Sequence, residues 1–164
     1  MINIVLIISF ILEGILSLFI PYIPYKLNFL YPHLVLICII FLYQYYKDKN
    51  KYYLILLLIG ILYDLIYTDV LFLHSFLFLI IGIFIKQYNK RIGITKKNLL
   101  ILVFMEILLY DSLYSLLLVL FQNMDFSLIE VLYKVLNSYI INVLYAYILY
   151  KLFPIKKKKH KKAI

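Results

Sequence analysis

Six apolar stretches separated by short polar segments organise this sequence. They cover residues 2–20, 32–46, 52–68, 70–86, 98–121 and 129–153. Apolar runs of this kind predict membrane-spanning helices, which need roughly 20 residues to cross the hydrocarbon core of a bilayer. The pattern therefore predicts an all-α integral membrane protein, in which a six-helix transmembrane bundle forms a single domain over residues 1–155.

The second stretch is the shortest, and its limits are Pro32 and the charged segment 47–49. Proline lacks an amide hydrogen and suits the first position of a helix, so Pro32 is predicted at that position. About 15 residues span a bilayer only with help from flanking tyrosines or from local thinning. A five-span chain with a re-entrant second segment is the alternative topology.

Composition supports the membrane class. The chain has 164 residues, of which 66% are hydrophobic, and its mean hydropathy is +0.98. Soluble domains contain roughly 45–50% apolar residues. Cys38 is the single cysteine, so no disulfide framework or thiolate metal cluster is expected. The N-terminus lacks a basic region and a cleavage motif, so residues 2–20 are expected to be a retained first span rather than a signal peptide.

Positive charge is distributed unevenly between the loops. With alternate loops assigned to opposite faces, 15 of the 17 Lys and Arg residues lie on one face, in the loops around residues 47–51 and 86–97 and from Lys151 onward. The opposite face receives Lys26 alone, with Asp69 and Asp125 in its other loops. The positive-inside rule then predicts a multi-pass membrane protein with both termini in the cytoplasm.

Residues 156–164 form a polybasic tail that is predicted to be cytoplasmic. Each lysine near an anionic membrane surface contributes about 1 kcal/mol of favourable interaction with the lipid, so the tail is interpreted as an orientation signal that contacts anionic lipid. Binding to a specific partner is the alternative. The net charge of +9 lies almost wholly in loops and tail, so no nucleic-acid partner is expected. The lysines of the tail are Lys156, Lys157, Lys158, Lys159, Lys161 and Lys162.

Polar residues recur at helical spacing inside several spans. In the first span Ser9, Glu13 and Ser17 share one face, which is predicted to look inward with Gly14 beside it. A polar seam is predicted along the last span, where polar or small side chains recur at every fourth residue. The fifth span adds two carboxylates, which lie about 140° apart around the helix. Ordinary helix packing explains the hydroxyl and amide groups, whereas the carboxylates indicate either structural pairing or a binding or interface role. This set comprises Glu106, Asp111, Lys134, Ser138 and Asn142, together with Glu130 and Ala146.

The sharpest candidate is the hairpin between Gly60 and Gly82. Asp64 and His74 each lie four or five residues from a turn near residues 68–70, so both are predicted roughly 6–8 Å below it and within reach of each other. The two glycines allow close helix approach. One aspartate and one histidine lack a third metal ligand and a nucleophile, so neither a metal nor a cofactor is expected and catalysis is disfavoured.

The run Gly60-Ile61-Leu62-Tyr63-Asp64, with His74 ten residues later and Gly82 eight further on, resembles the central signature of the MreD family. The segment 31–34, with Pro32, resembles the start of the second span in that family, and Lys90-Arg91 follows the fourth span where the family is basic. Two departures are the segment 68–72, which replaces a turn containing Gly and Pro, and His33, which replaces a common aspartate.

The resemblance implies a non-enzymatic scaffold of the rod-shape complex that organises lateral peptidoglycan synthesis. The implied partners are MreC, the actin-like MreB, and a RodA-type polymerase with its transpeptidase. It also implies a fold similar to the substrate-binding subunits of energy-coupling-factor transporters. The alternative functions are a vitamin-binding transporter subunit, disfavoured by short outer loops, and an intramembrane enzyme that uses Asp64, Glu106 or Asp111.

Overall fold

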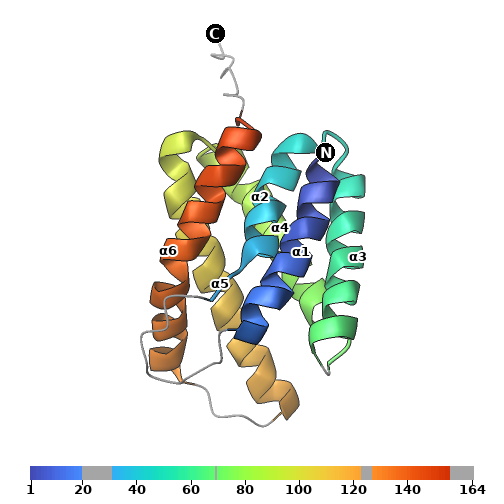
Figure 1. Cartoon of the computed structure of the whole chain (residues 1–164), viewed down its shortest axis with the longest axis vertical. Helices are drawn as coiled ribbons and strands as arrows, with labels where there is room; N and C mark the ends of the chain where they lie inside the picture. Colours follow the sequence, from blue (N-terminus) through green and yellow to red (C-terminus); the bar gives the residue numbers. More distant parts are fainter. Residues whose placement is uncertain (20–30, 69, 123–126, 156–164) are drawn as a thin grey trace.

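A computed structural model describes residues 1–19, 31–68, 70–122 and 127–155, and the described chain is a helical bundle (Figure 1). Its helices are α1 (Ile2–Phe19), α2 (Leu34–Tyr45), α3 (Lys49–Tyr67), α4 (Leu73–Arg91), α5 (Lys96–Gln122) and α6 (Leu128–Leu152). Six helices thus occupy the six predicted stretches, and no strand occurs in the described ranges. The predicted fold class, an all-α membrane bundle, is confirmed.

The short helix α2 is the core of the bundle. Leu34 to Tyr43 are all buried, and α2 contacts each of the other five helices. A helix that is apolar on every side belongs in an interior. Twelve residues give a length of only about 18 Å, but α2 is surrounded by protein and therefore does not have to match the thickness of the hydrocarbon. The burial of α2 within the protein therefore explains how so short an apolar segment is accommodated.

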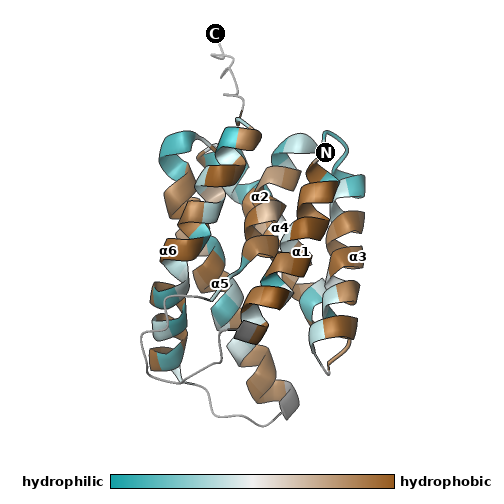
Figure 2. Cartoon of the chain, viewed as in Figure 1, coloured by the Kyte–Doolittle hydropathy of each residue, from teal (hydrophilic) through white to brown (hydrophobic). Residues whose placement is uncertain are grey.

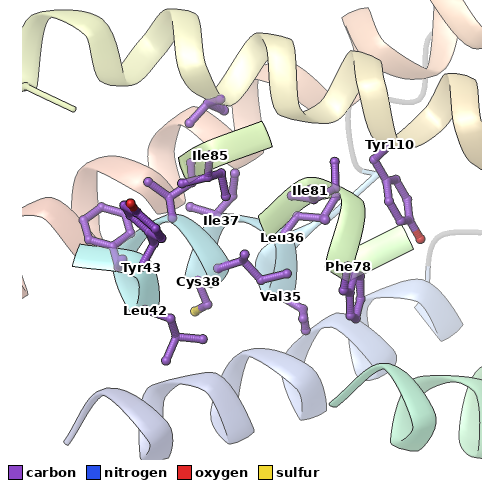
Figure 3. Packing of buried hydrophobic residues seen from close by; sticks show 14 of the residues in the cluster. Val35, Leu36, Ile37, Cys38, Leu42, Tyr43, Phe78, Ile81, Ile85 and Tyr110 are labelled. Carbon is purple, nitrogen blue, oxygen red and sulfur yellow. The ribbon is translucent and has the colours of Figure 1, made fainter. Parts of the chain in front are cut away.

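Helix α4 is the second buried element, and it packs against α2. Phe78, Ile81 and Ile85 of α4 meet the side chains of α2 around Leu36 and Ile37, as Figure 3 shows. These side chains are at most 2% exposed, so the centre of the bundle excludes both lipid and water. The outward faces of the other helices carry large exposed apolar side chains, among them Ile4, Ile7, Ile11, Leu54, Leu58, Leu62, Leu100, Ile101, Leu132, Leu136 and Ile140.

Those outward faces suit a lipid environment. Lys49–Tyr67, Lys96–Leu120 and Leu128–Leu152 are long and apolar enough, by length and composition, to cross a membrane, and Ile2–Leu18 and Leu34–Tyr45 are shorter apolar helices. Figure 2 shows apolar residues along the middle of the bundle and hydrophilic ones toward the end where the chain begins. We call that the basic end, since it carries Lys47, Lys49, Lys51, Lys86, Lys90, Arg91, Lys96, Lys97 and Lys151.

The helix limits differ from those predicted where local chemistry overrides hydropathy. Helix α3 begins at Lys49 because the Asp48 carboxylate accepts the Asn50 N–H (3.0 Å) as an N-cap. The prediction that Pro32 is the first residue of α2 is wrong: α2 begins at Leu34, with His33 as its N-cap. The Asn142 side chain holds the intervening backbone, accepting the His33 N–H (2.8 Å) and donating to the Tyr31 carbonyl (3.0 Å).

Candidate functional site

Asp64 and His74 are in direct contact, as their spacing predicted. Asp64 lies on α3 with 0% of its surface exposed, and His74 lies on α4 with 2% exposed. The distance from Asp64 Oδ1 to His74 Nδ1 is 2.7 Å. The Tyr63 ring stacks on the imidazole at a centroid distance of 4.3 Å, which fixes the plane of the ring. The pair is a buried polar contact between adjacent helices.

Asp64 also caps α4, a role that the sequence reasoning missed. The His74 backbone N–H lies 3.0 and 3.1 Å from the two carboxylate oxygens. His74 is the second residue of α4, and the N-cap residue Phe72 supplies no side-chain hydrogen bond. The first amides of a helix have no partner within it and favour negative charge. A carboxylate from α3 therefore supplies the cap that the local sequence 70–72 lacks.

The turn between α3 and α4 is strained at Phe72. Its φ of 66° lies in the left-handed region, which costs a residue with a Cβ roughly 1–2 kcal/mol. The phenyl side chain is 65% exposed, so packing of the ring does not explain this backbone conformation. The Asp64 contact with the first turn of α4 offsets the strain, which explains how the chain manages without the expected glycine.

Glu13 caps α2 in the same way. Its Oε2 accepts the Val35 N–H at 2.8 Å, and Val35 is the second residue of α2. Its other oxygen, Oε1, accepts the Tyr63 hydroxyl at 2.8 Å. The two buried helices, α2 and α4, thus each receive a carboxylate from the helix that precedes them in the chain. We call these contacts the cross-helix caps.

Glycines let α1, α3 and α4 approach closely around these caps. A Cβ added to Gly60 would collide with the backbone of Ser75 on α4, and one added to Gly82 would lie 2.5 Å from Leu56 on α3. Gly14 of α1 accommodates the Tyr67 ring, whose hydroxyl donates to the Phe10 carbonyl at 3.1 Å. The expected close approach of the hairpin helices is present at both predicted glycines.

The polar residues of α1 and α6 separate into inward and outward groups. Ser9 and Glu13 are buried as predicted, whereas Ser17 is exposed but lines a cavity, and its hydroxyl donates to the Gly14 carbonyl. On α6 the predicted seam faces inward: Ser138 and Asn142 are fully buried, and Lys134 is half-buried.

The two carboxylates of α5 occupy different surroundings. Asp111 Oδ1 lies 3.5 Å from His33 Nε2, at the start of α2. Glu106 is completely buried, and neither of its oxygens has a hydrogen-bond partner among the described residues. Among the described residues the two carboxylates share no partner. Asp111 belongs with Glu13 and Asp64, and we call the region of the bundle around these three residues the carboxylate end.

A cavity of about 580 Å³ opens at the carboxylate end. Residues of the helices or of the segments that flank them line it: Gly14, Ser17, Leu18, Tyr31, His33, Tyr63, Ile66, Tyr67, Thr68, His74, Tyr110, Asp111, Tyr114 and Lys134. Its wall is mainly aromatic, with a few charged groups. No group of three or more metal-ligating side chains is present in the part of the chain that the structure describes.

Several predicted positions lie outside the described residues. They are Lys26, Asp69, Asp125 and the tail lysines Lys156, Lys157, Lys158, Lys159, Lys161 and Lys162. The partner and lipid roles assigned to the tail stay predictions.

Comparison with known protein families decides the identity. The family model described as rod shape-determining protein MreD matches residues 1–156. The chain belongs to the MreD family. No curated protein and no solved structure gave a match. The chain is therefore a membrane protein of the rod-shape-determining system, while the similarity to transporter subunits stays a prediction.

Proposed function

We propose that this MreD protein is a non-enzymatic scaffold that organises lateral peptidoglycan synthesis through helix contacts with MreC and other subunits of the elongasome. Membership in a shape-determining family supports the general role. The observation that best supports the scaffold role is the pair of cross-helix caps. Asp64, one of the three carboxylates considered for catalysis, binds the N-terminus of α4, and Glu13 binds that of α2.

A scaffold needs a fixed interior and an exterior that partner helices can contact. The caps fix α2 and α4 relative to α1 and α3, so that the outward faces keep a defined spacing. Those faces carry exposed apolar side chains at helical spacing, such as Ile4, Ile8 and Ile11 on α1. Transmembrane partners associate through side-chain packing on such faces. MreC, MreB and a RodA-type polymerase with its transpeptidase are the partners that the family suggests.

Both termini are proposed to lie in the cytoplasm of a bacterium, with the bundle in its inner membrane. The start of α1 and the end of α6 lie at the basic end (Figure 1), where positive charge favours the cytoplasmic side. A reporter fused after Ile164 or within 92–95 should then read cytoplasmic, and one inserted near residues 122–125 should read external. An external reading at Ile164 would refute this orientation.

The test of the scaffold role is recovery of partners from gently solubilised membranes. Affinity purification of the tagged chain with mass spectrometry should recover MreC and the wall-synthesis enzymes. Recovery of a pair of ATPases without MreC would instead support the transporter alternative.

A further inference from the structure

The contact between Asp64 and His74 leaves one nitrogen of the imidazole available. Asp64 Oδ1 lies 2.7 Å from Nδ1, and the Tyr63 ring covers one face of the imidazole. The second ring nitrogen, Nε2, makes no hydrogen bond within the described residues, and it is not fully enclosed by protein. His74 lines the cavity of about 580 Å³ at the carboxylate end. Nε2 is therefore the polar atom that the imidazole presents to this cavity.

Two tyrosine hydroxyls of α5 line the same cavity in the same condition. Tyr110 and Tyr114 lie about one helical turn apart, and their rings are 12° from parallel with centroids 6.0 Å apart. Among the described residues neither hydroxyl has a hydrogen-bond partner, and neither is fully enclosed. The centroid of the Tyr114 ring lies 5.5 Å from that of the His74 imidazole. In the described part of the chain, three polar atoms from α4 and α5 thus line one cavity without a hydrogen bond to the protein.

The charged groups around the cavity favour a neutral ligand. Asp111 Oδ1 lies 3.5 Å from His33 Nε2, and Asp64 is bonded to His74. The ammonium of Lys134 already makes an interaction within the protein. Each charged group therefore has a partner before any ligand enters. An ion that left water for this cavity would find no spare counter-charge, which is costly, whereas a neutral ligand avoids that cost.

A hydroxyl group is the neutral group that fits all three polar atoms. A tyrosine hydroxyl both donates and accepts, and imidazole Nε2 does one or the other according to its protonation. A ligand hydroxyl also does both through a single oxygen, so it pairs with each of these atoms in either state. The rings of Tyr63 and Tyr67 line the cavity from α3 and offer flat surfaces to the C–H face of a saturated ring. Hydroxyls on a saturated ring are the chemistry of sugars and cyclic polyols.

We propose that the cavity at the carboxylate end binds a small neutral sugar or cyclic polyol, whose hydroxyls pair with His74 Nε2 and with the hydroxyls of Tyr110 and Tyr114. The volume of about 580 Å³ falls within the roughly 300–1,000 Å³ of small-ligand sites. Asp64 then has a second role, since its bond to Nδ1 orients the imidazole toward the ligand. A free solute and the sugar headgroup of a glycolipid both offer this chemistry. The proposal goes beyond the scaffold role and does not depend on it.

The test uses the purified full-length chain in phosphatidylcholine nanodiscs, with methyl β-glucoside as the probe. Saturation-transfer NMR should detect the glucoside on discs that contain the protein and not on empty discs. The methyl glycosides of glucosamine and of glucuronic acid carry a positive and a negative charge on a similar ring. Both should bind at least about tenfold more weakly, because neither finds a counter-charge in the cavity. Absence of detectable glucoside binding, or tighter binding of a charged analogue, would overturn the proposal.

Two variants locate the site. Tyr110→Phe and Tyr114→Phe each remove one hydroxyl and keep the ring and both cross-helix caps. Each should weaken glucoside binding about two- to tenfold, the value of one hydrogen bond. Tyr45→Phe is the matched control, since it makes the same change on an exposed side chain at the basic end, and it should bind as wild type does. Should one cavity variant fail to fold, the other decides. Equal binding by wild type and the folded cavity variants would overturn the assignment.

A competition arm distinguishes the two sources of the sugar. The glucoside measurement is repeated in nanodiscs that also contain monoglucosyl diacylglycerol, a neutral lipid with a sugar headgroup. Loss of the glucoside signal indicates that the lipid headgroup occupies the cavity, whereas an unchanged signal indicates a free solute. Both results require that the glucoside binds in phosphatidylcholine discs, so they support the site and differ only in its occupant.

Discussion

Replacing Asp64 should be more damaging than replacing the histidine it contacts. Asp64→Leu removes the cap on the His74 N–H, which costs about 0.5–2 kcal/mol by the values for helix N-caps. It also removes the bond to the imidazole, about 0.6–1.7 kcal/mol by values for polar contacts between membrane helices. The expected loss is about 1–4 kcal/mol of unfolding free energy. His74→Leu keeps the backbone cap and should lose only the second contribution.

A double-mutant cycle on unfolding free energy in detergent micelles measures these losses. The Asp64→Leu, His74→Leu double variant should be about as stable as Asp64→Leu alone, because the imidazole contact is already absent there. Asp64→Asn should cost less than Asp64→Leu, since its amide oxygen still accepts the His74 N–H. As a control, Asp48→Ala removes an exposed local cap on α3 and should cost about 0.5–1 kcal/mol.

Two results would refute this reasoning. Equal losses for Asp64→Leu and His74→Leu would mean that the carboxylate does not cap α4. Strictly additive losses in the double variant would mean that the two side chains do not act on each other.

The same physical account makes four further predictions. Glu13→Leu should destabilise the bundle by about 1–3 kcal/mol in the same unfolding assay, because it removes the cap on α2 and orphans buried groups, and a neutral result would refute that cap. Gly60→Ala should push α3 away from Ser75, seen as a longer distance between spin labels on α3 and α4 and a loss of about 1–3 kcal/mol. Phe72→Gly should raise stability by about 1 kcal/mol by relieving the positive φ, and any loss would contradict the strain. Deletion of residues 156–164 should leave a folded bundle in the membrane fraction, whereas its disappearance from membranes would show that the tail is needed for insertion.

Sequence analysis correctly predicted features that depend on residues close together in the chain. Apolar stretches predicted the helices, and the ten residues between Asp64 and His74 placed both near one turn, where the structure finds them in contact. The glycine at position 60 also predicted a close helix contact. Each of these features depends on residues within one hairpin, so their relative positions follow from helix geometry.

Contacts between distant segments could not be predicted in this way. The Glu13 bond to the Val35 amide and the Asn142 bond to the His33 amide join residues from different helices. Periodicity shows which face of a helix is polar but not which neighbour it meets. One signal was present for the cap on α4: the segment 70–72 contains no capping side chain, so an acceptor from elsewhere was required.

Hydropathy alone also could not predict that α2 is buried within the protein. An apolar segment of this length is equally consistent with a strained span, a re-entrant segment and a core helix, because lipid and protein interiors both accept apolar side chains. Only the arrangement of the other helices around Leu34 to Tyr43 distinguishes these cases.

The most direct test of the scaffold claim is photocross-linking in living cells, with a photoreactive amino acid placed at single positions. Ile11 on α1, Leu62 on α3 and Leu136 on α6 are exposed side chains of three different helices, whereas Ile39 on α2 is fully buried and serves as the control. The scaffold account predicts that at least one exposed position cross-links to MreC or a wall-synthesis enzyme and that Ile39 cross-links to none. Cross-links to lipid alone from every exposed position would contradict it.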